Sequence, residues 1–249
     1  MSRRVRWWVL GAGLAGTGVV LLLAVLDLPV FGSAFHPYRD AAVAAAVQHG
    51  TANVVASVTF DQRGLDTVFE ETILFGSVVA VAALLRPAEG ERLQLETGSR
   101  VPLEASRLFG YLLLPLTLVV GLDVVAHGHV TPGGGFQGGI MLATGLHLLY
   151  VAGRYRSLEQ LRPVPLFETA EAAGTAAFTA LGFAGLAVAG SFLANVLPFG
   201  AFGQLLSAGT VPLANVAVGV AVGSGGVVLL AQFFRQVFLV TRDEEGARP

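Results

Sequence analysis

Residues 128–139 read G-H-V-T-P-G-G-G-F-Q-G-G and join two long apolar segments of the chain. Six of the 32 glycines of the protein fall within these twelve positions. Glycine lets a backbone turn and pack closely at angles that a Cβ atom forbids, and Pro132 ends or caps a helix rather than continuing one. The stretch is therefore either a structured hairpin, which seats a partner subunit or lines an ion route, or a compact connector.

The composition of the whole chain is that of a membrane protein. Hydrophobic residues make up 54% of it and charged residues only 13%, and the apolar residues come in long runs. A spanning helix needs about 20 apolar residues, and spans are helical because unpaired backbone groups are costly in lipid. The sequence thus predicts an all-α integral membrane protein with about six transmembrane helices, at residues 7–26, 68–85, 108–126, 137–153, 167–190 and 212–234.

The distribution of arginine predicts the orientation. The chain contains no lysine, and with these six spans thirteen of its 15 arginines lie on one side of the membrane. The opposite side holds only Arg39 and Arg63. Because connections rich in basic residues stay in the cytoplasm, both termini are expected to be cytoplasmic.

Charge and cysteine content exclude several function classes. The net charge is −2 and no basic aromatic surface is evident, so we expect no nucleic-acid partner. The chain has no cysteine, which excludes disulfides, thiolate metal sites and iron–sulfur ligation. We therefore expect the bilayer and other membrane subunits as partners, no cofactor or resident metal, and no enzyme activity in this chain.

A second informative stretch, residues 53–71, reads N-V-V-A-S-V-T-F-D-Q-R-G-L-D-T-V-F-E-E. Asp66 and Glu70 are four residues apart and share a helix face at the start of a span. Acidic groups at a helix N-terminus are favoured by its dipole, which is the structural interpretation. The functional interpretation makes Glu70, one turn into the bilayer, a proton or cation relay. Glu71 points about 100° away, and only one of the pair need face protein.

Other ionisable residues mark the third, fourth and fifth spans. Asp123 and His127 are four apart, so the carboxylate and the imidazole can meet on one helix face. His147 stands near the middle of the fourth span, and Glu168 and Glu171 begin the fifth. Pairing, a hydrogen-bonded neutral ring and helix capping explain these residues structurally. An outer, middle and inner ionisable set is also what a relay across the membrane needs.

Three further expectations concern the remaining segments. His36 and His49 lack a second ligand at metal spacing, so a solvated histidine is expected at both positions. The glycine-rich fifth and sixth spans predict close helix contacts. The uncharged connection from residue 191 to residue 212 is interrupted by glycine and proline, and we expect a buried loop or a short re-entrant element there.

The two informative stretches resemble parts of one transport system. Residues 128–139 resemble the signature loop Gly-His-x-x-Pro-Gly-Gly-Gly-Phe-x-Gly-Gly of the B subunit (MnhB or MrpB) of multisubunit sodium/proton antiporters, and residues 105–240 resemble the whole four-span subunit. Residues 61–70 resemble the Arg-Gly-Phe-Asp-Thr-x-x-Glu segment near the C-terminal end of the large MrpA protein, also found in a small subunit of membrane-bound hydrogenases. The chain thus divides into residues 1–104, a two-span region like that segment, the B-like domain, and a cytoplasmic tail, 241–249.

This resemblance implies stacked transmembrane helices in a large complex of the cytoplasmic (inner) membrane that couples proton flux to sodium movement. It marks Arg63, Asp66 and Glu70 in the first stretch, with Glu70 as the best candidate for handling the ion. In the loop it marks His129, Pro132, Gly133, Gly134, Gly135, Phe136, Gly138 and Gly139. The chain departs from the family pattern in two places: Leu65 replaces a phenylalanine, and the final span has no charged side chain near Ala221.

The resulting hypothesis is a subunit of a monovalent cation/proton antiporter complex, which contributes to the sodium path and to subunit docking. Proton pumping itself is assigned to a partner, because the large antiporter-like subunits are built around buried lysines and this chain has none. One alternative is the same module in a hydrogenase-type respiratory complex. The other is a purely structural scaffold.

Overall fold

The structure, a computed structural model, describes residues 3–28, 32, 34–87, 92–93, 103–152, 155–236 and 239–240. Two short strands pair antiparallel, β1 (Arg92–Leu93) with β2 (Leu239–Val240). All other regular elements in the described residues are helical: α1 (Arg3–Leu26), α2 (Pro37–Gln48), α3 (Val54–Ser57), η1 (Val58–Gln62), α4 (Gly64–Leu84), α5 (Glu104–Ala126), α6 (Gly135–Val151), α7 (Tyr155–Leu161), α8 (Val164–Ala189) and α9 (Val211–Gln236). The predicted all-α class is confirmed.

The chain forms two units, Met1–Asp40 and Ala41–Pro249. The first contains α1, whose described side chains are exposed along its whole length although nearly all of them are apolar. A helix that is apolar on every face is typical of a membrane span. The second unit contains α3 to α9 and the hydrophobic core.

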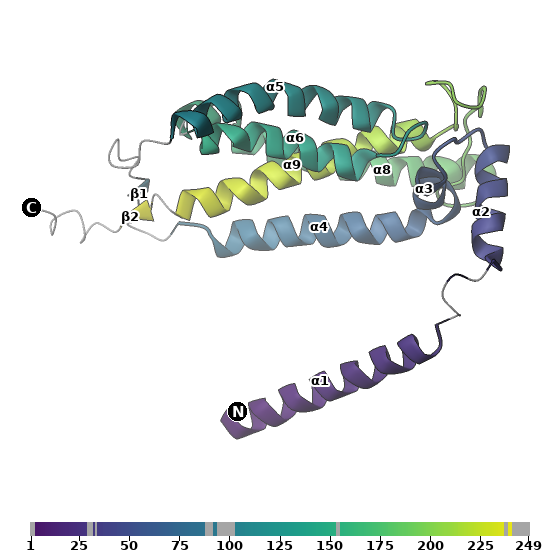
Figure 1. Cartoon of the computed structure of the whole chain (residues 1–249), viewed down its shortest axis with the longest axis horizontal. Helices are drawn as coiled ribbons and strands as arrows, with labels where there is room; N and C mark the ends of the chain where they lie inside the picture. The colour runs from purple at the N-terminus through teal and green to yellow at the C-terminus, as the bar shows by residue number, and fades with distance from the viewer. Residues whose placement is uncertain are drawn as a thin grey trace, which may run out of the picture. The chain divides into compact units, whose positions relative to one another are not determined.

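The second unit is built around α9, which runs between α6 and α4 (Figure 1). Within its most apolar stretch 72% of residues are buried, against 17–22% in α4, α5 and α8. Close packing follows from small residues on both sides of each contact. A Cβ atom on Gly139 of α6 would lie 2.9 Å from the carbonyl oxygen of Gly219, and one on Gly174 of α8 would lie 2.6 Å from the backbone nitrogen of Ala221. The predicted glycine contacts are confirmed.

Each of the six predicted spans lies on a helix. Within the described residues, five helices are long and apolar enough to cross a membrane: α1, α4, α5, α8 and α9. The sixth, α6, has 17 residues, at the short end of the range for a span. Helices α1, α4 and α5 begin four residues before the predicted spans, because their first turns carry charged, polar or small side chains that hydropathy does not count. The orientation of the termini stays a prediction, and the predicted tail 241–249 lies outside the described residues.

The connection between α8 and α9 differs from the expectation. Residues 191–210 form neither a re-entrant helix nor a buried loop but a series of turns, held by Asn195. The Asn195 side chain donates to the carbonyl oxygen of Ala208 at 3.0 Å and accepts from the backbone N–H of Thr210 at 2.8 Å. Residues 207 and 208 are buried, residues 192–196 and 199 are half-buried, and residues 200–206 are exposed.

Candidate functional site

The glycine loop enters α6 through two residues with positive φ, Gly133 (148°) and Gly134 (145°). L-residues with a side chain rarely adopt such angles. The backbone N–H of Gly135, the first residue of α6, then donates to the side-chain oxygen of Asn215 in α9 at 2.8 Å. A Cβ atom on Gly135 would collide with the carbonyl oxygen of Asn215. The glycines therefore allow the loop to lie directly on α9, and the loop is structured.

The two informative stretches of the sequence, 53–71 and 128–139, meet at the end of the bundle where α6 begins. Asn53 caps α3, accepting from the backbone N–H of Val55 at 3.1 Å. Its side-chain amide donates to the carbonyl oxygens of Gly128 at 2.7 Å and Thr131 at 3.0 Å, and its backbone N–H donates to the carbonyl oxygen of His129 at 3.0 Å. One asparagine thus joins the 53–71 stretch to the loop.

A pocket of about 420 Å³ lies between the two stretches. Thr59 of η1 and Thr67 and Glu70 of α4 line one side, and the backbone of Gly133–Gly135 and the side chain of Gln137 line the other. The Thr67 hydroxyl donates to the carbonyl oxygen of Thr59 at 2.8 Å, which fixes the start of α4. Glu70 is the one ionisable residue among those that line this pocket. The structure therefore brings the predicted Glu70 and the predicted loop together around one opening, whose remaining lining is apolar: Val55, Ala56, Phe60, Phe136 and Ile140.

His129, the histidine of the loop, is fully buried. Its Nε2 lies 3.0 Å from the carbonyl oxygen of Leu205, so this nitrogen carries the proton and donates. Burial lowers the pKa of His129 below its ordinary value of 6.5, because a charged ring loses its hydration there. A neutral ring therefore ties the loop to the connection between α8 and α9.

Asp66 and Glu70, the two acidic residues predicted to share a face at the start of α4, are both exposed. Asp66 forms an ion pair with Arg63 at 2.5 Å, and both side chains are more than half exposed. Pro132 and Gln137 are also exposed, whereas Gly138 and Gly139 are buried against α5 and α9 respectively. The loop residues marked by the family resemblance thus divide into an outer face and a packed inner face.

Glu71 is the functional candidate that sequence reasoning left aside. Its side chain is 2% exposed, whereas the neighbouring Glu70 is exposed. In α8 the same contrast separates Glu171, 3% exposed, from the exposed Glu168. A helical spacing gives the signal: Gly64, Thr67, Glu71 and Val78 form the buried face of α4.

The other predicted residues do not line this pocket. The His127 Nδ1 lies 2.8 Å from an Asp123 carboxylate oxygen, so the predicted pairing is confirmed, and both side chains are exposed. His147 is 6% exposed, and its Nδ1 lies 2.6 Å from the carbonyl oxygen of Ala143 in its own helix. Its ring packs beside Phe234. This hydrogen bond of His147 stays within α6 and connects the ring to neither Glu70 nor the loop.

The expectation of a solvated His49 is wrong. Its Nδ1 lies 2.5 Å from the carboxylate of Asp61, which is 4% exposed, and its ring stacks on Phe199 at 4.5 Å between centroids. This pairing braces α2 against η1. Spacing could not reveal it, because twelve residues and two helix ends separate the partners in the sequence.

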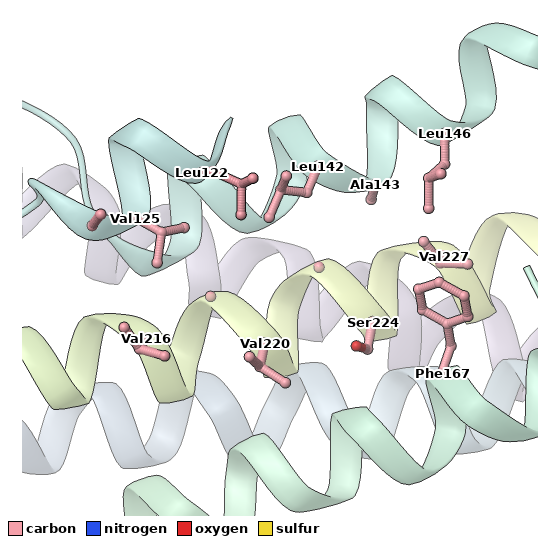
Figure 2. Close-up of a pocket in the computed structure, with 13 residues that line it drawn as sticks. Leu122, Val125, Leu142, Ala143, Leu146, Phe167, Val216, Val220, Ser224 and Val227 are labelled. Carbon is pink, nitrogen blue, oxygen red and sulfur yellow. The ribbon is translucent and has the colours of Figure 1, made fainter. Parts of the chain in front are cut away.

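A second cavity, of about 360 Å³, runs along α9 where it faces α5, α6 and the start of α8 (Figure 2). Figure 2 shows Val216, Val220, Ser224 and Val227 of α9 on one side and Leu142 and Leu146 of α6 on the other. The hydroxyl of Ser224 is its one side-chain polar group. This cavity suits apolar contacts and offers no ion chemistry. Among the described residues, no group of three His, Cys, Asp or Glu side chains is arranged to hold a metal ion.

Comparison with known proteins assigns the larger unit. Residues 105–229, half of the chain, match the family described as a domain related to the MnhB subunit of the Na⁺/H⁺ antiporter. The chain belongs to the MnhB family. This family is one of antiporter subunits in transport complexes, and the matched range begins with α5 and reaches through most of α9.

Two curated relatives extend the MnhB match. An uncharacterized protein of Methanocaldococcus jannaschii is 29% identical over 199 residues, which cover 70% of this chain and 73% of the relative. A probable A/B subunit of a K⁺/H⁺ antiporter from Rhizobium meliloti is 28% identical over 186 residues, 66% of this chain. This chain spans only 18% of the length of that second relative.

Two solved structures share the fold. One chain of the membrane-bound sulfane sulfur reductase, an archaeal respiratory membrane complex, matches with a TM-score of 0.65 and 27% identity, over 92% of this chain and 98% of that one. A chain of the Mrp complex from a Dietzia species matches with a TM-score of 0.66 and 25% identity, over 93% of this chain and 26% of that one. The MnhB-family chain is thus a multi-pass membrane subunit of a multisubunit cation/proton antiporter-type complex.

Proposed function

We propose that this chain helps to form the sodium path of such a complex and docks its neighbouring subunits, while a partner pumps the protons. The pocket that holds Glu70 against Gly133–Gly135 carries this proposal. It sets one carboxylate beside threonine and glutamine side chains and glycine backbone, whose oxygens are ligands of the kind that a hard monovalent cation takes, within an otherwise apolar lining. Glu70 lies at the end of a predicted span, where an ionisable group is a functional candidate.

The test is sodium transport in membrane vesicles that contain the whole complex. Glu70→Gln removes the charge and keeps the volume, and we expect sodium efflux to be lost while the complex still assembles. Glu104→Gln is the matched control, because Glu104 is exposed in the first turn of α5, away from the pocket. Unchanged transport in Glu70→Gln would remove this residue from the path.

The remaining relay candidates from the sequence extend the same proposal. Combined alanine substitution of Asp66, Glu70, Asp123 and His147 leaves transport near normal if the chain is a scaffold alone. Transport that collapses with normal assembly supports a path through this chain. Glu168 and Glu171 are tested singly by glutamine substitution in the same vesicles.

Docking is supported by the connection between α8 and α9. Phe202, Leu205 and Leu206 expose 57%, 52% and 88% of their surface on this non-helical segment. Clustered apolar side chains outside the predicted spans favour contact with another protein. We expect Leu206→Ser to reduce co-purification of partner subunits, with Gln204→Ala in the same segment as the control. Equal recovery from both variants contradicts a docking role.

A redox-driven complex is the second candidate, and the match over 98% of a chain in a respiratory reductase complex favours it. Purification of the tagged chain in mild detergent, followed by mass spectrometry, separates the two. Antiporter-like subunits alone support the antiporter, and additional iron–sulfur or nickel–iron subunits support the redox complex. In either complex we place the chain in the cytoplasmic membrane with both termini inside, and residues 1–104 as the fused MrpA-like region.

A further inference from the structure

Two carboxyl groups are buried where α4, α8 and α9 pack together. Glu71 of α4 is 2% exposed and Glu171 of α8 is 3% exposed. The helices that carry them, α4 and α8, contact each other, and both contact α9. Ionisable groups inside a membrane bundle are costly, so a pair of them on contacting helices indicates a function rather than packing alone.

The described residues leave these carboxyls without hydrogen bonds. Both oxygens of Glu71 and Oε1 of Glu171 are buried and have no partner there. The contact with α9 is made by Gly225, where an added Cβ atom would lie 2.9 Å from Oε1 of Glu171 and 3.4 Å from Cγ2 of Val78. The missing side chain at Gly225 thus leaves the space that the Glu171 carboxyl occupies.

The surroundings of the pair offer no compensating positive charge among the described residues of the packed helices. On the same helices Glu70 and Glu168 are acidic and exposed. In η1, which packs on α4 and α9, Asp61 is already bound to His49. Before Arg235 in its last turn, α9 carries only uncharged polar side chains: Asn215, Ser224 and Gln232.

Such carboxyls must be neutralised by a proton or by a cation, since an unpaired buried charge is strongly disfavoured. A metal cation needs several oxygen ligands, and the described residues show no suitable cluster of three ionisable ligands. A proton needs only one oxygen, and two adjacent carboxyls can share it. We propose that Glu71 and Glu171 form a buried carboxyl pair that holds an exchangeable proton inside the bundle. The inference rests on the proposed function, because a cation/proton complex gives such a proton a use.

Dicyclohexylcarbodiimide tests the pair, because it reacts with protonated carboxyl groups in apolar surroundings. Native membranes that contain the whole complex are treated across a pH series, and labelled peptides are identified by mass spectrometry. We expect Glu71 or Glu171 to be labelled near neutral pH, faster than the exposed Glu70 and Glu104, and labelling to fall as the pH rises. Labelling of neither buried residue, or labelling at the rate of the exposed ones, overturns the proposal.

Variants test the coupling between the two groups. In Glu71→Gln the like-charged neighbour is gone, so Glu171 can ionise more readily, and we expect its labelling to slow by about ten-fold. Gly225→Ala displaces the Glu171 carboxyl and should also change its labelling, whereas Gly76→Ala, which meets nothing within 4 Å, should not. Unchanged Glu171 labelling in Glu71→Gln contradicts a shared proton. Should a variant fail to assemble, the pH series on the unaltered complex still decides.

Sodium chloride, replaced by choline chloride at constant ionic strength, distinguishes the two possible occupants. Labelling that is unaffected by sodium supports a proton as the occupant of the pair. Protection of both residues by sodium overturns the proposal in favour of a cation site. The readout does not require transport, so normal labelling beside an unaffected Glu70→Gln variant would reject the sodium path alone.

Discussion

The side-chain oxygen of Asn215 in α9 accepts a hydrogen bond from the backbone N–H of Gly135 at 2.8 Å, and Gly135 is the first residue of α6. The first N–H groups of a helix have no partner within the helix. The central helix thus caps its neighbour, and the glycine loop takes its position from α9 as well as from its own turns.

Asn215→Ala should destabilise the complex by about 1–3 kcal/mol, because a buried N–H loses its partner. Thermal melting of the purified complex in detergent measures the effect. Ser77→Ala is the control, since the Ser77 hydroxyl is exposed and bonds the Ile73 carbonyl in its own helix. Equal melting temperatures of the two variants would show that the hydrogen bond between Gly135 and Asn215 contributes little to stability.

Gly139→Ala should weaken the contact between α6 and α9. The added methyl group would lie 2.9 Å from two backbone atoms, the oxygen of Gly219 and the nitrogen of Gly223. Backbone cannot rotate away as a side chain can, so a loss of about 1–3 kcal/mol is expected. The yield of intact complex measures this loss. Gly76→Ala is the control, because a Cβ atom there meets nothing within 4 Å. A normal yield would contradict tight packing at Gly139.

His129 predicts a pH dependence. The folded state holds its pKa below the ordinary 6.5 through burial. Below pH 6.5 the unfolded chain therefore binds the proton more readily, and the free energy of unfolding falls as the pH drops toward the folded pKa. Above 6.5 this contribution to stability is fully present. His129→Gln should make the melting temperature depend less on pH. His36→Gln, at an exposed position, should leave the pH dependence of the melting temperature unchanged.

Asp66→Asn should change stability by less than about 1 kcal/mol, because its ion pair with Arg63 is solvent-exposed and such pairs contribute little. Assembly and melting temperature are the measurements. Should the variant assemble normally and lose sodium transport, Asp66 acts in the path. A large drop in melting temperature would instead show that this pair holds the start of α4.

Periodicity predicts much of this fold. The six apolar runs, the glycine contacts of α8 and α9, and the meeting of Asp123 with His127 all follow from helix geometry, which sequence spacing reports directly. The choice between Glu70 and Glu71 needs more than hydropathy, because both lie in the same turn. The small residues Gly64 and Thr67, on the same face as Glu71, carry the missing information.

Other features depend on contacts that no local pattern encodes. Asn53 binds the loop across 75 residues of sequence, and His49 meets Asp61 only because helices α2 and η1 fold back on each other. The lack of charge in the connection 191–210 predicts burial, but residues 200–206 are exposed. Among them the apolar side chains of Phe202, Leu205 and Leu206 lie on the surface of this chain, as they would in a subunit that has neighbours.

The adjacent glutamates of α4 also constrain how the gene can vary. Consecutive residues lie about 100° apart around a helix, so Glu70 opens to the pocket while Glu71 turns into the bundle. Inserting one residue between Gly64 and Glu70 would turn Glu70 into the bundle, and deleting one would turn Glu71 toward the pocket. Length changes in this segment should therefore be rejected by selection even where single substitutions are accepted.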